Sequence, residues 1–338
     1  MYDVAIVGHG VLANVMVQLL SGAGLQNITL AAGGKPPPSS SHTLGANQTR
    51  ILNALGYGDA LLDQGHTPDR EQVRLTRSAY MLAETPLGKF YADRYGAPLI
   101  NIEHTLLEEI TASSIIPEDL TLTDLESSHA LVLNTVGETI EAENPLQWYI
   151  SEISEGAHRA NITWIGTGTV CWQFSTRNST HFVFAVDQEA RLSKEFWHPS
   201  LHEVLTAAKP VDPGYVQTRE HWLEGNVVHL GEACLGNSRL LRETFWTGLE
   251  DAWVLSRMIE NYEEAYLEGV GEYVKFRRPR VAKIAKFIND RTRAYTEPMP
   301  SKRLFSNLGI AFRSRFLPEM AMQRVDWLHK YDCIRGFH

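Results

Sequence analysis

The sequence predicts an α/β fold made of a parallel-sheet domain, an inserted antiparallel sheet and C-terminal helices. Residues 3–7, DVAIV, are an unbroken apolar run that leads into the turn GHG and then into a helical pattern. Residues 160–187 alternate apolar and polar positions and are rich in aromatic and β-branched residues. Residues 272–295 and the segments after them have helical periodicity. Together these patterns indicate a Rossmann-like domain carrying an inserted antiparallel sheet.

The first domain is expected to begin with a strand, a turn, a helix and a second strand. Residues 14–25, NVMVQLLSGAGL, supply the helix, and residues 27–32, NITLAA, supply the second strand. The Gly/Pro/Ser stretch at 33–41 must be a loop. Further along, the pattern predicts two amphipathic helices and then a buried strand, at residues 45–65, 101–114 and 129–137.

The domain boundaries follow from changes in these patterns. The chain returns to the first domain with the strand NVVHLGE at 226–232 and a helix at about 248–262. Part of 57–100 is expected to join the antiparallel sheet. We assign the Rossmann-like domain, the antiparallel substrate domain and the C-terminal helical segment to residues 1–144 with 216–290, 145–215, and 291–338.

Composition narrows the class of protein. The 338 residues are 43% apolar and 21% charged, as in soluble globular proteins, and no run of roughly 18 apolar residues predicts a membrane span. The start of the chain lacks the pattern of a signal peptide, and three scattered cysteines favour a reducing, cytoplasmic compartment. The net charge of −9 disfavours nucleic acid as a partner, so we expect a small-molecule ligand. The sequence leaves open whether the chain forms a homodimer.

Four segments in this order resemble those of one enzyme family. They are LGEA, GLEDAWVLSRMI, RRPRV and DWLHKYD, at 230–233, 248–259, 277–281 and 326–332. With the strand–turn–helix start, they make the chain similar to the FAD-dependent aromatic hydroxylases, the p-hydroxybenzoate hydroxylase-like single-component flavoprotein monooxygenases. The resemblance covers nearly the whole chain and implies that family's fold.

The resemblance also implies where a cofactor would bind. Gly8, Gly10 and Ala13 stand at the glycine motif, where a pyrophosphate approaches a helix N-terminus. Gly231 stands where the family has the glycine of a Gly-Asp pair at the end of a later strand. A tight turn with nothing bound needs the same glycines, so both interpretations stay open.

Other cofactor contacts of the family are absent. The second strand ends in Ala31 and Ala32 without the acidic residue that binds ribose. Val136 replaces the aspartate of a second strand–turn, and residues 242–246 replace glycines beside the flavin ring with large side chains. We therefore predict that the fold persists without FAD, and FAD binding with divergent contacts is the alternative.

The charged residues around the altered glycine site are the catalytic candidates. A carboxylate beside apolar rings has a raised pKa and acts as a general acid or base, while an arginine binds an oxyanion. A surface ion pair at a helix start explains Arg242 and Glu243 equally, and His9 is open to a structural role. The predicted catalytic residues are Glu243, Arg242, Arg239, Glu232 and His9.

Aromatic residues are candidates for binding the substrate. Those in the antiparallel strands share one parity within each strand, which allows them to face a common pocket. An ordinary sheet core is the alternative. The predicted substrate-binding residues are Phe245, Trp246, Trp172, Phe174, Phe182 and Phe184. No spacing of Cys and His predicts a metal site.

Three functions are consistent with these patterns. The first is a cofactor-free, non-redox enzyme of secondary metabolism that performs cyclisation, isomerisation, dehydration or hydrolysis on an apolar or aromatic metabolite. The second is a FAD-dependent monooxygenase with divergent cofactor contacts. The third is a non-catalytic ligand-binding or partner protein. The first is the main prediction, because the altered glycine site has the composition of a pocket for another ligand.

Overall fold

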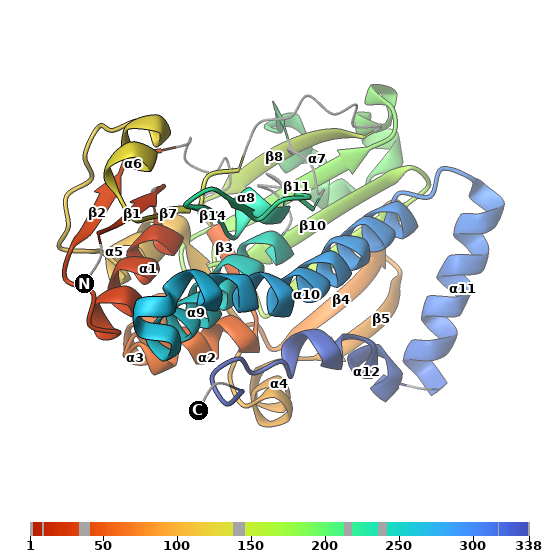
Figure 1. Cartoon of the computed structure of the whole chain (residues 1–338). Helices are drawn as coiled ribbons and strands as arrows, with labels where there is room; N and C mark the ends of the chain where they lie inside the picture. Colours follow the sequence, from red (N-terminus) through yellow and green to blue (C-terminus); the bar gives the residue numbers. More distant parts are fainter. Residues whose placement is uncertain are drawn as a thin grey trace.

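The computed structural model describes most of the chain. The described residues are 3–8, 10–33, 41–137, 146–212, 218–235, 242–316 and 318–336; for 242–246, 316, 318, 319 and 321 the side chains are not included. Figure 1 shows the two larger sheets of the molecule, with long helices lying across one side of them.

The first sheet has five strands in the order β13-β14-β7-β1-β2. β1 pairs in parallel with both β2 and β7, and β7 pairs in parallel with β14. The strands are β1 Val4–Val7, β2 Ile28–Ala31, β7 Leu131–Asn134, β13 Leu223–Glu224 and β14 Val227–His229. The apolar run at residues 4–7 is fully buried, as a strand covered on both faces requires.

The second sheet has seven strands in the order β12-β8-β11-β10-β9-β4-β5. It draws strands from two parts of the sequence, because β4 and β5 precede the inserted segment and β4 pairs in parallel with β9. The strands are β4 Arg70–Leu75, β5 Met81–Pro86, β8 Gln147–Ile153, β9 Ala160–Gly166, β10 Thr169–Ser175, β11 Thr180–Val186 and β12 Lys209–Val211.

A small two-stranded sheet and several short helices connect the two larger sheets. The sheet pairs β3 Ser41–Leu44 with β6 Ile100–Glu103. The short helices are α4 Gly88–Tyr95, α5 His104–Ile110, α6 Leu122–Ser128, α7 His202–Thr206, α8 Glu232–Leu235 and the 3₁₀ turns η1 Glu189–Leu192, η2 Lys194–Phe196, η3 Pro199–Leu201 and η4 Glu263–Ala265.

Longer helices cover the sheets. α1 Val11–Gly22 packs against α9 Arg242–Tyr262, and α9 packs along α10 Tyr266–Tyr295, which contains Pro279. α11 Pro300–Phe316 and α12 Pro318–His329 complete the chain, with α11 at the edge of the molecule beside β5 (Figure 1). No helix in the described part of the chain combines the length and the apolar character that crossing a bilayer requires.

The predicted α/β architecture is confirmed, although two predicted helices differ in detail. The helix expected at 45–65 is two helices, α2 Ala46–Ala54 and α3 Gly58–Gln64. Gly56 between them has φ +90°, a conformation that ends a helix and that glycine adopts without steric cost. The helix expected at 101–114 is shorter, because its first residues belong to β6.

Buried ion pairs join α9 to α10. Arg277 lies 2.6 Å from Asp251 and 2.9 Å from Glu250, and all three side chains are fully buried. Asp251 also accepts a hydrogen bond from the backbone of Gly231, while Glu250 pairs with Arg280. This network therefore fixes the turn after β14 relative to both helices.

Candidate functional site

The turn after β1 has the geometry of an anion-binding loop. Gly8 and Gly10 have φ values of +147° and +77°, which residues with a Cβ rarely adopt. A Cβ on Gly8 would collide with the hydroxyl of Thr135. Gly10 is the N-cap of α1, so no side chain caps the positive end of that helix. The loop can therefore bring backbone N–H groups close to a phosphate.

A carboxylate lies over this loop. A Cβ built on Gly10 would come 2.8 Å from Oε1 of Glu108, a residue of α5. His104 Nε2 is 3.3 Å from the same oxygen, and His104 Nδ1 is 2.8 Å from Nε2 of His42. Burial, followed by the nearby His104, lowers the pKa of His42 to about 3, so His42 is neutral at physiological pH.

An acidic residue also lies at the end of β2, although it comes from another segment. Glu118 forms a parallel bridge with Ala31, and its carbonyl accepts a hydrogen bond from the N–H of Ala32. Its side chain is exposed. The sequence lacks an acid in β2 itself, but the fold brings one beside the strand end where a ribose is bound in dinucleotide-binding folds.

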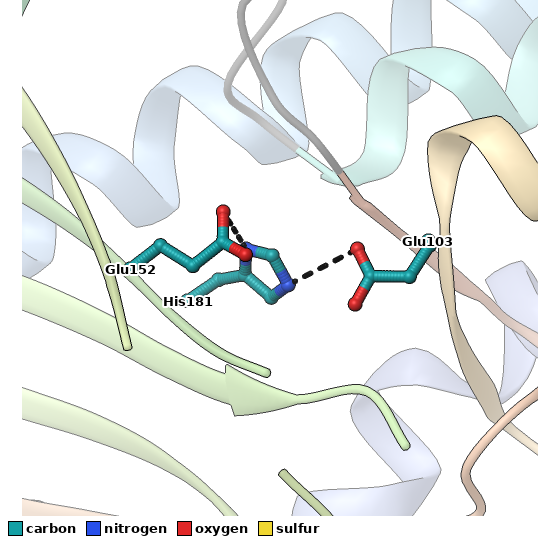
Figure 2. A group of neighbouring side chains, drawn as sticks. All are labelled: Glu103, Glu152 and His181. Atoms are coloured by element: carbon teal, nitrogen blue, oxygen red, sulfur yellow. Dashed lines mark ion pairs between the residues drawn. The ribbon is translucent and has the colours of Figure 1, made fainter. Parts of the chain in front are cut away.

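A second cluster lies where the small sheet meets the seven-stranded sheet. The His181 ring of β11 stands between the carboxylates of Glu152 on β8 and Glu103 at the end of β6 (Figure 2). Glu103 Oε2 is 3.6 Å from Nε2 of His181, and Glu152 Oε2 is 3.5 Å from Nδ1. The side chains of Glu152, Glu103 and His181 are 47%, 16% and 7% exposed, so the cluster runs from solvent to the interior.

Hydrogen bonds hold Glu103 ionised. The hydroxyl of Thr176 donates to its Oε1, and the hydroxyl of Ser179 donates to the same atom at 2.6 Å. Burial by itself would raise the pKa of Glu103, but the nearby His181 and the hydrogen bonds from Ser179 and Thr176 outweigh it and lower this pKa to about 2. Because Ser179 donates to Glu103, its oxygen is free to accept from His181 Nε2, 2.8 Å away.

The cluster offers two kinds of chemistry. A proton can pass between Glu152 and the interior through the two ring nitrogens of His181. The three side chains are also, within the described residues, a group whose ligand-type atoms lie near enough to surround one metal ion. Proton transfer fits the observed contacts better, because Ser179 already occupies the Nε2 side of the ring.

For four of the five predicted catalytic residues the structure does not describe the side chain. His9 and Arg239 are not among the described residues, and the side chains of Arg242 and Glu243 are not described. The same holds for the side chains of two predicted substrate-binding residues, Phe245 and Trp246. Their predicted roles, including the filling of the flavin-ring site, therefore remain predictions.

The other predicted residues of the glycine sites have defined positions. Ala13 is fully buried in α1. Gly231 has φ +61°, and a Cβ there would come 2.6 Å from Leu12 and 3.2 Å from the Cα of Gly248. Gly231 is therefore required for the close packing of the β14–α8 turn on α1 and α9. Glu232 follows as the first residue of α8 and is partly exposed.

The four sheet aromatics do not share a face, contrary to the prediction. Trp172 pairs directly with Val183, and Gln173 pairs with Phe182. Trp172 and Phe174 therefore pack with Val183 on the face towards α10 and α11, whereas Phe182 and Phe184 lie on the opposite face with Trp197. Even-numbered residues of two neighbouring strands lie on one face only if the strand register pairs even-numbered residues with each other. Between β10 and β11, even-numbered residues pair with odd-numbered ones.

An open hollow of about 410 Å³ lies on the same face as Phe182. Its lining includes Arg70, Arg74 and Arg159 but none of the four sheet aromatics. Carboxylates neutralise part of this charge, because Glu84 lies 3.5 Å from Arg70, and Asp69 accepts a hydrogen bond from Arg159. The aromatic residues therefore form sheet core, and the hollow beside them is polar.

Sequence reasoning did not place Glu103, Glu108, Glu118 or Glu152 at a site. The strand-to-helix junction at Glu103 and His104 was not predicted, because residues 101–114 were expected to form one helix. Glu103 contacts His181 of β11, and His104 contacts His42 of β3, so these partners lie far away in sequence. His42, His104 and His181 stand in the sequence, but nothing in it indicates which side chains they meet.

Comparisons with known proteins point to one kind of enzyme. The 6-hydroxynicotinate 3-monooxygenase of Pseudomonas fluorescens is 24% identical over 321 residues, which cover 76% of this chain and 82% of that protein. HpxO of Klebsiella pneumoniae, solved with FAD and uric acid, superposes with a TM-score of 0.74 at 17% identity over 94% of this chain and 95% of that chain. A salicylate hydroxylase substrate complex gives a TM-score of 0.72 at 15% identity over 98% and 96% of the two chains. No family model matches the sequence.

These comparisons correct the main functional prediction. The predicted cofactor-free, non-redox enzyme is contradicted, because the sequence relatives are monooxygenases and the matching folds include FAD complexes. The expectation that no cofactor binds has no support for the same reason. The alternative, a FAD-dependent monooxygenase with divergent contacts, fits the findings better.

Proposed function

We propose that this chain, a homologue of the FAD-dependent aromatic hydroxylases in fold and sequence, is a FAD-dependent monooxygenase acting on a small aromatic or heteroaromatic compound. The observation that carries the proposal is the pair of glycines, Gly8 and Gly10, at positive φ before the uncapped N-terminus of α1. This device accepts a dinucleotide pyrophosphate without any side chain.

The residues present fit FAD at its nucleotide end. Gly8, Gly10 and the first turn of α1 would hold the pyrophosphate once the Glu108 side chain, which is 33% exposed, turns towards solvent. Glu118 would supply the acidic acceptor for the ribose that β2 lacks. The missing acid in β2 is thus replaced by one from a neighbouring segment.

Bound FAD would supply the redox chemistry, in which dioxygen is activated and one oxygen atom is added to the substrate. The protein's own contribution is proton transfer. His181 accepts a proton at Nδ1 or donates one from Nε2, and Glu103 stabilises the charged ring. Glu152, at the solvent side, exchanges that proton with water.

The substrate class is inferred from the similar proteins. Their names specify 6-hydroxynicotinate, salicylate and uric acid, which are small planar rings bearing acidic groups. A ring with an ionisable hydroxyl or ring N–H is the kind of substrate for which a buried proton relay is useful.

We place the enzyme in a reducing compartment, because Cys171, Cys234 and Cys333 are all buried free thiols.

The direct test is a FAD titration of the full chain. Binding should quench flavin fluorescence, and the melting temperature should rise with the logarithm of the FAD concentration once that concentration exceeds the dissociation constant. The loaded protein should then oxidise NADH or NADPH faster when an aromatic or heteroaromatic acid is added, and the product should carry oxygen from labelled O₂. A protein that gains neither flavin absorbance nor thermal stability at high FAD concentration is not this enzyme.

A further inference from the structure

α11 presents an apolar stripe to solvent. Leu304, Phe305, Leu308 and Phe312 are 59%, 75%, 57% and 58% exposed. At about 100° per residue, these four side chains fall within an arc of roughly 100° on one side of the helix. Single exposed apolar residues are common, but four on one helix face form a patch that marks an interaction surface.

The packing face of α11 is on its other side. Arg303 is buried and donates hydrogen bonds to the carbonyls of Ala294 and Tyr295. Ile310 packs against the core of the seven-stranded sheet. The stripe is thus not the surface by which α11 attaches to the protein, and Figure 1 shows α11 at the edge of the molecule.

The charge around the stripe is positive. Besides the buried Arg303 of the packing face, residues 298–318 contain three cationic residues, Lys302, Arg313 and Arg315, and no Asp or Glu, in a chain whose net charge is −9. Among the described residues, Lys302, Arg313 and Arg315 have no carboxylate partner within ion-pair distance. An acidic protein has thus gathered unpaired cations beside an exposed apolar helix face.

We propose that α11 binds the surface of an anionic phospholipid bilayer. The stripe would enter the boundary between headgroups and acyl chains, and Lys302, Arg313 and Arg315 would contact lipid phosphates. A second copy of the chain fits this surface less well, because a twofold contact through the stripe would bring both sets of cations together. This proposal is independent of the proposed oxidation chemistry.

The test is flotation of the purified full chain with two kinds of vesicle. The chain should float with vesicles of mixed phosphatidylcholine and phosphatidylserine, and much less with phosphatidylcholine alone. Added salt should weaken the binding, since electrostatic attraction to the lipid surface is screened. Absence of binding to the anionic vesicles at low salt overturns the proposal.

Matched variants assign the binding to the stripe. Phe305→Ser with Phe312→Ser should reduce the vesicle partition coefficient about 100-fold, from the lost burial of two aromatic rings. Arg313→Gln with Arg315→Gln should reduce it about 30-fold, from about 1 kcal/mol for each lost cation. The control is Phe90→Ser, which removes a 48% exposed ring on α4 and should leave binding unchanged.

Two further measurements keep the result decisive. The melting temperature of each variant checks that these exposed positions are not needed for folding. Leu308→Ser is a second stripe variant, to be used if the chain with Phe305→Ser and Phe312→Ser does not fold. Size-exclusion chromatography with light scattering tests the competing occupant. A dimer that the serine variants dissociate, together with vesicle binding that they leave unchanged, would show that the stripe joins two copies and would overturn the proposal.

Discussion

The carboxylate of Glu108 lies over the backbone of Gly10, with its Oε1 2.8 Å from the position that a Cβ would take. A negative group therefore occupies the space in front of α1 that an anionic ligand needs. Two unit charges about 4 Å apart repel by about 4 kcal/mol in a partly solvated site, and rotation of the side chain towards water reduces this cost.

Glu108→Gln should therefore tighten FAD binding about tenfold, because the amide removes the charge and keeps the shape. The measurement is the FAD dissociation constant from fluorescence quenching at low salt. Glu109→Gln on the same helix is the control and should leave the constant unchanged. Equal affinities of Glu108→Gln and the native chain would contradict this repulsion without affecting the proposed function, whereas no FAD binding by either protein would contradict both.

Glu103→Gln should lower stability at neutral pH by about 3 kcal/mol, because the pKa of this carboxyl falls from 4.5 to about 2 on folding. A lowered carboxyl pKa stabilises the fold above the unfolded value, and that stabilisation is lost as pH falls from about 4.5 towards 2. Urea unfolding at pH 7 and at pH 3 measures both effects. The difference in stability between the two proteins should shrink to about 1.4 kcal/mol at pH 3, and a constant difference would count against the assignment.

Arg277→Met should destabilise the fold by about 3–5 kcal/mol, since it leaves the Asp251 and Glu250 carboxylates buried with one cation fewer. Chemical denaturation at neutral pH gives the value. Lys275→Met is the matched control two residues away, because its ion pair with Glu272 is exposed and contributes little. Similar losses of stability in the two variants would mean that the buried ion pairs of Arg277 contribute no more to stability than the exposed pair of Lys275.

His329→Gln should make the stability of the fold less sensitive to a fall in pH. Burial, helped by Arg291, Arg50 and Arg280, lowers the pKa of His329 from 6.5 to about 3. The native state then keeps this ring neutral while the unfolded chain binds a proton, so stability falls as pH drops from 6.5 towards 3.

The slope attributable to this one proton is about 1.4 kcal/mol per pH unit. Melting temperatures between pH 7.5 and pH 5 should therefore decline less in the variant than in the native chain. His42 keeps a similarly lowered pKa, so part of the decline should persist. Parallel curves for the two proteins would exclude His329 as a source of the acid sensitivity.

Local patterns were sufficient for the architecture. A buried apolar run followed by glycines and a helix predicts a strand–turn–helix unit, and alternation with aromatic residues predicts an antiparallel sheet, because burial of one face fixes the period of each element. The break at Gly56 was missed, since the apolar face continues across it and only the φ of that glycine separates the helices.

The site depended on contacts between distant segments, which periodicity does not encode. Strand register decided that Trp172 and Phe182 lie on opposite faces, because parity within a strand has no meaning until a partner strand is aligned. The sequence by itself determined the folding units and the glycine loop at Gly8 and Gly10. Only the tertiary structure brought Glu103, Glu152 and His181 together, since each comes from a different strand and is brought to the others by strand pairing and helix packing.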